Sequence, residues 1–307
     1  MERRRKRPDR RRRMRRKCSR WLEALTIAGV LLGACGLAVA QSGQSSQSGQ
    51  GGQSQPPAQS TDKSKTPDVT PLTLDAAPPV NAEEDAAFKA FKDVPSTDLN
   101  KKIELGEDLV KKYPQSRYLP PVYYSLTIAY MQTNQVQKML DVGDKEVALV
   151  PNDITTLAIL AQTISRTTNS STPNAAQQLD KAATYAKKAI ELAPTLPKPE
   201  NLTEETFTAG KNQALIAAHS GLGLVLIKHG KNADAIPEFE QAVKLDTNPD
   251  PVNYYLLGMA NKSTSHFDDA IAAFNKCAAA PGPMQAQCKA QADDTKKKSA
   301  TELSAPK

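Results

Sequence analysis

The sequence predicts an all-α solenoid, a stack of helix pairs, because part of the chain repeats itself at an offset of 35 residues. Leu222-Gly223 recurs as Leu257-Gly258, and Asp234-Ala235-Ile236 recurs as Asp269-Ala270-Ile271. The matched residues are small or apolar, with a spacing that suits two antiparallel helices touching at small side chains. A unit of this size cannot bury its apolar stripe alone, so neighbouring units must supply the core.

These blocks resemble the tetratricopeptide repeat, whose first helix carries a large residue, then Leu-Gly and an aromatic. Its second helix carries Ala, an aromatic and another Ala, followed by Pro. One unit of this chain matches at His219, Leu222, Gly223, Ala235, Phe239 and Ala242, and the next at Tyr254, Leu257, Gly258, Ala270, Phe274, Cys277 and Pro281. The chain departs from the pattern at Leu226, Asn261 and Thr247, and His219 stands where the pattern has a larger ring. The resemblance implies a right-handed solenoid whose first helices line a concave surface.

The same period predicts three weaker pairs upstream of these two. The first is expected over residues 81–114, where Asn81 and Ser96 stand as N-caps before helical patterns. The second is expected over residues 123–151, and the third over residues 157–194. The chain therefore predicts about five helix pairs.

Three further features complete the helical part of the chain. A polar insertion at residues 166–174 predicts a surface loop within the third pair. Residues 204–229 lack Pro and predict one long helix, with Thr203 as its N-cap, which opens the fourth pair. A polar helix over residues 284–298 is expected to cap the last apolar face.

The chain divides into four regions. Residues 1–40 form a basic leader with a hydrophobic segment, and residues 41–80 form a Gln/Ser/Gly/Pro-rich linker that is expected to be disordered. Residues 81–298 hold the repeats and their cap, and residues 299–307 form a disordered tail.

Most of the positive charge lies in the leader. Residues 1–23 carry thirteen Lys and Arg and three acids, a net of +10, so the rest of the chain sums to −3, which is +7 minus +10. The helical region therefore lacks the electrostatic signature of a nucleic-acid-binding domain.

The apolar run at residues 24–40 follows this basic stretch, which is the layout of an export signal cleaved between Ala40 and Gln41. Met14 would then serve as an alternative start that leaves an ordinary signal. Two other interpretations stay open. Cys35 ends a sequence that resembles a bacterial lipobox and would be lipidated, or the run stays as an uncleaved anchor near the lower length limit for a span. In each case the repeats are exported.

Two cysteines fall near the end of the repeats. Cys277 lies in the last repeat and Cys288 in the proposed cap, close enough in sequence to meet across a helix turn. An exporting route permits a disulfide between them, which would fix the cap to the repeat. The alternative is a buried thiol at Cys277 and an exposed one at Cys288.

Residues suited to catalysis or metal binding are scarce. The chain has three histidines: His219 occupies a packing position, and His229 and His266 fall at turns. No His and Cys spacing matches a zinc site, and Gly221-Leu222-Gly223 lacks the third glycine of a dinucleotide-binding loop. We therefore expect neither an enzyme nor a protein that carries a cofactor or metal.

The resemblance instead implies a partner-binding groove lined by side chains beside the packing positions of the first helices. Aromatic and Met side chains with a few cations suit peptide anchoring. The alternative is that several of them pack on the long helix and belong to the core. The implied groove residues are Tyr124, Ile128, Met131, Gln162, Arg166, Leu224, Ile227, Lys228, Tyr255, Met259 and Lys262.

Together these features predict an exported scaffold or adaptor in the periplasm or cell envelope of a bacterium. The turn at residues 113–118 resembles one found in bacterial envelope repeat proteins. The expected partner is a protein or peptide, with no nucleic acid, and with membrane contact only through the N-terminal segment. The alternatives are a groove that binds a small molecule or glycan, or an auxiliary subunit of an envelope enzyme.

Overall fold

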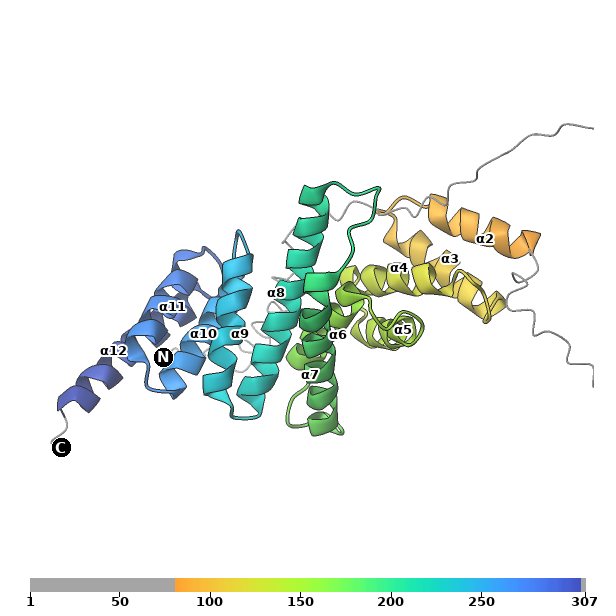
Figure 1. Cartoon of the computed structure of the whole chain (residues 1–307). Coiled ribbons are helices and arrows are strands. Elements are labelled where there is room, and N and C mark those ends of the chain that lie inside the picture. Colours follow the sequence, from red (N-terminus) through yellow and green to blue (C-terminus); the bar gives the residue numbers. More distant parts are fainter. Residues whose placement is uncertain (1–80, 305–307) are drawn as a thin grey trace, which may run out of the picture.

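The computed structural model describes residues 81–304 and shows a row of helices, each packed on the next (Figure 1). The leader and linker, with Cys35, Ala40 and Gln41, lie outside the described residues. Within the described part every regular element is helical, which confirms the predicted all-α solenoid. Its elements are α2 (Ala82–Asp93), α3 (Leu99–Lys112), α4 (Leu119–Gln132), α5 (Val136–Leu149), α6 (Ile154–Thr167), α7 (Ala175–Leu192), the short 3₁₀ helix η2 (Ala193–Thr195), α8 (Glu204–Lys228), α9 (Asn232–Leu245), α10 (Pro251–Ser263), α11 (Phe267–Ala279) and α12 (Gln285–Ser304).

The helices α2 to α11 form the five predicted pairs, and α12 follows them as the terminal helix. The polar insertion between α6 and α7 is a loop over residues 168–174, while Arg166 and Thr167, which were predicted to belong to it, are the last two residues of α6. At the C-terminus, α12 continues to Ser304, so the tail predicted from residue 299 is largely helical. No helix of the described part is long and apolar enough to span a lipid bilayer.

Helix starts are set by local capping. The Asn81 side chain accepts a hydrogen bond from the Glu83 backbone N–H at 3.1 Å, and Thr203 caps α8 in the predicted manner. The prediction of Ser96 as a cap is wrong. Asp98 directly precedes α3 and its carboxylate accepts from the Lys101 backbone N–H at 3.1 Å. An N-cap must lie next to the first helical residue, and Ser96 lies too far upstream.

Within the last two pairs the repeated spacing of small and large residues has a direct steric cause. A Cβ added at Gly258 would lie 2.6 Å from the Phe274 ring, and one added at Gly223 would lie 2.9 Å from the Phe239 ring. Each glycine in the first helix therefore makes room for the aromatic ring of the second. Both rings are fully buried, so this contact forms the centre of each pair.

The long helix α8 lies between the third and fifth pairs and packs on α6, α7 and α9 (Figure 1). Its contact with α6 is unusually close, because a Cβ at Gly221 would lie 2.9 Å from the Gln162 backbone nitrogen. Gly221 is thus the place where the two helix backbones meet. The repeat pattern in the sequence assigns this glycine no structural role.

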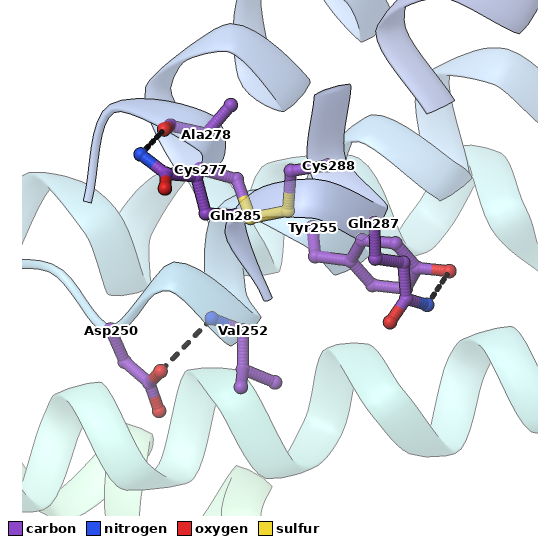
Figure 2. The surroundings of a disulfide bond; sticks show 8 residues. All are labelled: Asp250, Val252, Tyr255, Cys277, Ala278, Gln285, Gln287 and Cys288. Carbon is purple, nitrogen blue, oxygen red and sulfur yellow. Dashed lines mark hydrogen bonds between the residues drawn. A yellow bond between two sulfur atoms is a disulfide. The ribbon is translucent and has the colours of Figure 1, made fainter. Parts of the chain in front are cut away.

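The terminal helix α12 is attached to the last pair by a disulfide between Cys277 of α11 and Cys288 of α12 (Figure 2). Both cysteines are buried, and the two Cα atoms lie 5.8 Å apart. The Gln285 side chain also donates a hydrogen bond to the Ala278 carbonyl at 3.0 Å. Together these contacts hold the start of α12 against the end of α11.

Candidate functional site

The implied groove residues lie on four helices, α4, α6, α8 and α10, which are the first helices of the second to fifth pairs. They are therefore placed on equivalent elements, as the resemblance implies. Their surroundings differ, however, from one end of the solenoid to the other. Those nearest the C-terminus have partners within the chain, whereas those on α4 include the most exposed apolar side chain of the set.

On α10, the three residues contact the terminal helix. The Tyr255 hydroxyl accepts a hydrogen bond from the Gln287 side chain at 2.9 Å (Figure 2), and its ring packs against Phe274. Met259 joins the same apolar cluster, which includes Ala292 of α12. The Lys262 ammonium donates to Gln291 at 2.8 Å and to Asp294 at 2.6 Å. The last repeat of the implied groove is thus covered by α12.

On α8, two of the three residues belong to the packing between the fourth and fifth pairs. Leu224 and Ile227 are half-buried against a core cluster that includes Phe239 and Leu257. The Lys228 ammonium donates a hydrogen bond to the Ser165 carbonyl at 2.6 Å and another to the Thr168 carbonyl. These carbonyls lie at the C-terminal end of α6, where a cation is favoured by the helix dipole. Lys228 therefore joins α8 to α6.

On α6, Arg166 forms an ion pair with Asp250 at 3.5 Å. Asp250 is the N-cap of α10 and accepts from the Val252 backbone N–H at 2.9 Å (Figure 2). Arg166 thus links the third pair to the fifth. Gln162 is half-buried, and its backbone nitrogen is the atom that faces Gly221 of α8. The close packing of α8 leaves this part of the surface largely occupied by the chain itself.

On α4 the situation is different. Met131 is 37% exposed, and neither Met131 nor Ile128 belongs to any of the apolar core clusters of the described chain. Tyr124 is half-buried. Among the eleven implied residues, Met131 is the most exposed apolar side chain, and the half-buried Ile128 lies on the same helix outside the core clusters.

In the part of the chain that the structure covers, no group of three or more His, Cys, Asp or Glu side chains is placed to hold a metal ion. His219 is half-buried and pairs with Glu238 at 2.7 Å between α8 and α9. His229 faces Asp180 at 3.7 Å, and His266 precedes α11.

One buried ionisable group was not predicted from the sequence. Glu146 of α5 is 2% exposed, and its Oε2 atom makes no hydrogen bond within the described chain. Burial, with Asp153 beside it, raises the pKa of its carboxyl to about 8. The repeat pattern of the sequence nevertheless indicates that this position is buried. Glu146 lies twenty positions after Leu126. The same spacing separates Ala242 from Leu222 and Cys277 from Leu257, so the equivalent position in the last two repeats holds a small residue that is buried.

A family model supports the repeat assignment for the last helix pair. Residues 252–280, which cover almost all of α10 and α11, match the tetratricopeptide repeat family model. No curated protein matches the chain. Among solved structures, the tetratricopeptide-repeat protein TTC0263 of Thermus thermophilus is 18% identical, with a TM-score of 0.41, over 69% of this chain and 98% of that chain.

Two structures of MamA are also similar. The structure of MamA MSR-1 is 17% identical, with a TM-score of 0.44, over 64% of this chain and 95% of that chain. A further MamA crystal structure is 16% identical, with a TM-score of 0.45, over 73% of this chain and 97% of that chain. The family match assigns α10 and α11 as a tetratricopeptide repeat, and the four helix pairs that precede them have the same arrangement of two successive helices.

Proposed function

We propose that this protein is a non-catalytic adaptor of the bacterial cell envelope that binds a peptide segment of a partner protein at α4. Repeat solenoids present extended concave surfaces formed by their first helices, and they bind other proteins there. The observation that carries the proposal is the apolar surface of Ile128 and Met131, which lies outside every core cluster of the described chain.

Methionine suits this role because its flexible, unbranched side chain adapts to partners of different shape. The half-buried Tyr124 on the same helix adds a rigid aromatic side chain nearby. By contrast, Tyr255, Met259 and Lys262 hold α12, so we assign them to the solenoid rather than to the partner. The binding surface is thus proposed for the N-terminal half of the solenoid.

Export is the second part of the proposal. The basic leader and the apolar run at residues 24–40 support it, and the buried disulfide of Cys277 and Cys288 fits an oxidising compartment. The mature N-terminus would arise by cleavage after Ala40, by lipidation of Cys35, or by retention of the run as an anchor. Mass spectrometry of the protein purified from its host distinguishes these three forms.

The adaptor role is tested by crosslinking in cells, followed by mass spectrometry, on the wild type beside Met131→Glu and Ile128→Ala. A charge in place of an anchor residue of this kind weakens the binding free energy by about 2 kcal/mol or more. The affinity for the partner, and with it the amount of partner recovered, should therefore fall about thirtyfold with Met131→Glu. Leu149→Glu is the matched control, because Leu149 is an apolar side chain on α5 that is 51% exposed.

Circular dichroism must show the same melting temperature for all variants before the results are compared. A partner that is captured equally by the wild type and Met131→Glu would refute the assignment of the surface to α4. The absence of any reproducible partner would refute the adaptor role itself.

A further inference from the structure

A second candidate surface lies between α3 and α5, which are the second helices of the first two pairs. A groove of ≈ 300 Å³ separates them, and α4 forms its floor. The floor carries Tyr123 and Tyr130, and the walls carry Val110 from α3 and Val142 from α5. The groove is therefore apolar at its base, as is usual for sites that bind a side chain of a ligand. We refer to it as the α3/α5 groove.

This surface is distinct from the one proposed above. Tyr123, Leu126 and Tyr130 point from α4 into the α3/α5 groove, whereas Ile128 and Met131 do not line it. At about 100° per residue, the two sets are centred roughly 140° apart around α4. A ligand in one surface would thus not contact the other.

The charges of the groove are balanced at one end. Lys138 of α5 forms an ion pair with Glu107 of α3 at 2.8 Å, and Glu107 also accepts a hydrogen bond from the Tyr130 hydroxyl. These bonds hold the pKa of the Glu107 carboxyl below its usual value. The two walls are therefore joined across this end.

The other end carries two lysines that form no ion pair, and the acid Asp141 of α5 lies one helical turn before one of them. Lys111 extends from α3 and Lys145 from α5, both exposed, and neither makes an ion pair within residues 81–304. The Lys145 ammonium lies 5.9 Å from the centre of the Tyr123 ring, directly above the apolar floor. An anion that lies near both ammonium groups is attracted by each of them.

In the neighbouring gap between α5 and α7, by contrast, a lysine is paired with an acid of the chain itself. There Asp144 of α5 faces Lys181 of α7 and pairs with it, and it also accepts a hydrogen bond from the Tyr185 hydroxyl at 3.0 Å. The cation in that gap is neutralised by the chain itself. In the α3/α5 groove the corresponding acid is Asp141 of α5, which accepts a hydrogen bond from the Gln137 side chain at 2.9 Å and forms no ion pair with a lysine of the described chain.

We infer that the α3/α5 groove binds an acidic peptide segment of a partner protein. An aliphatic side chain of that segment lies between Val110 and Val142, and an Asp or Glu carboxylate beside it lies between Lys111 and Lys145. The inference goes beyond the proposed function, because it assigns a second partner surface that is formed by second helices. A protein with both surfaces would hold two partners at once.

The test selects ligands from a random peptide library displayed on phage, with the purified full-length protein as bait. A selected peptide is synthesised with a fluorescein label and titrated by anisotropy against three proteins. These are the wild type, the double variant Lys111→Gln/Lys145→Gln and the matched control Lys187→Gln/Lys244→Gln. The control lysines are exposed on α7 and α9 and, like the groove lysines, make no described ion pair.

The inference expects selected peptides in which an acidic residue stands beside a large aliphatic one. Because the groove variant removes two exposed charge pairs with the peptide, affinity should fall about tenfold in that variant and stay unchanged in the control. Binding should also weaken as salt is added. Met131→Glu should leave this binding intact, which separates the result from that of the proposed function.

Several results would overturn the inference. Peptides that lack acidic residues, or that bind the groove variant as well as the wild type, exclude the lysine pair as the recognition element. Tighter binding by a synthetic peptide of residues 62–76 would identify the linker as the occupant. Self-association in sedimentation that is lost in the groove variant would identify a second copy. Competition by inorganic phosphate alone at equal affinity would identify a simple anion site.

Discussion

The buried carboxyl of Glu146 makes stability depend on pH in a direction that can be worked out. Its pKa is raised to about 8 in the folded protein, against an ordinary value near 4.5, because burial and the adjacent Asp153 disfavour the charged form. Between these two values the folded state keeps a proton that the unfolded state has released. Stability therefore falls as pH rises through this window, and the full loss is reached above the folded pKa.

The magnitude follows from the size of the shift. One pKa unit corresponds to about 1.4 kcal/mol, so this one group should lower the free energy of unfolding by about 3 kcal/mol between pH 5 and pH 8. Glu146→Gln keeps the shape of the side chain and removes its titration. The variant should match the wild type at pH 5 and be more stable by about 3 kcal/mol at pH 8.

Urea unfolding followed by circular dichroism at a series of pH values measures this difference directly. Glu107→Gln serves as a control of opposite sign, because the pKa of Glu107 is lowered by its hydrogen bonds with Lys138 and Tyr130. Relative to the wild type, that variant should lose stability as pH rises through the lower range. If the difference between Glu146→Gln and the wild type does not vary with pH, the reasoning about the buried carboxyl is refuted.

Two further predictions concern the packing of the solenoid. Gly221→Ala should destabilise the protein by about 1–2 kcal/mol, because the added Cβ would meet the α6 backbone. Gly210→Ala should instead stabilise the protein by about 0.5–1 kcal/mol, because no neighbouring atom lies within 4 Å of a Cβ added there and Ala favours the helix. Shifts of the urea midpoint in the same direction for both variants, relative to the wild type, would contradict this expectation. Reduction of the bond between Cys277 and Cys288, which are separated by 11 positions, should remove about 2–3 kcal/mol from the wild type. The Cys277→Ala/Cys288→Ala variant should not respond to reductant in the same melting experiment.

Much of the fold was predictable because each repeat makes its packing contacts within itself and with the repeats next to it. The pairing of Gly258 with Phe274, and of Gly223 with Phe239, is fixed by residues inside one unit, so a period found in the sequence specifies the contact in space. The predicted cap of α3 failed for a local reason. Ser96 and Asp98 both favour helix starts, and only the position of the first helical residue decides between them.

The candidate surface was harder to predict, because it depends on contacts between units rather than within them. The resemblance treats every first helix as an open part of one groove. In this chain Gly221 lets α8 approach the backbone of α6, and Lys228 then reaches the carbonyl groups at the end of that helix. Neither contact follows from the repeat pattern, since Gly221 lies outside the positions that define it.

The same reasoning explains why binding is proposed at the N-terminal end of the solenoid. A terminal unit must bury the face that a following unit would have covered, and here α12 does so by contacting Tyr255, Met259 and Lys262. The side chains that would recognise a partner in an internal repeat are, in the last repeat, the ones that hold the cap. Ile128 and Met131 lie on α4, away from both the cap and the close contact of α8 with α6. Position within the solenoid, and not the type of side chain, therefore decides which of the equivalent residues stay accessible to a partner.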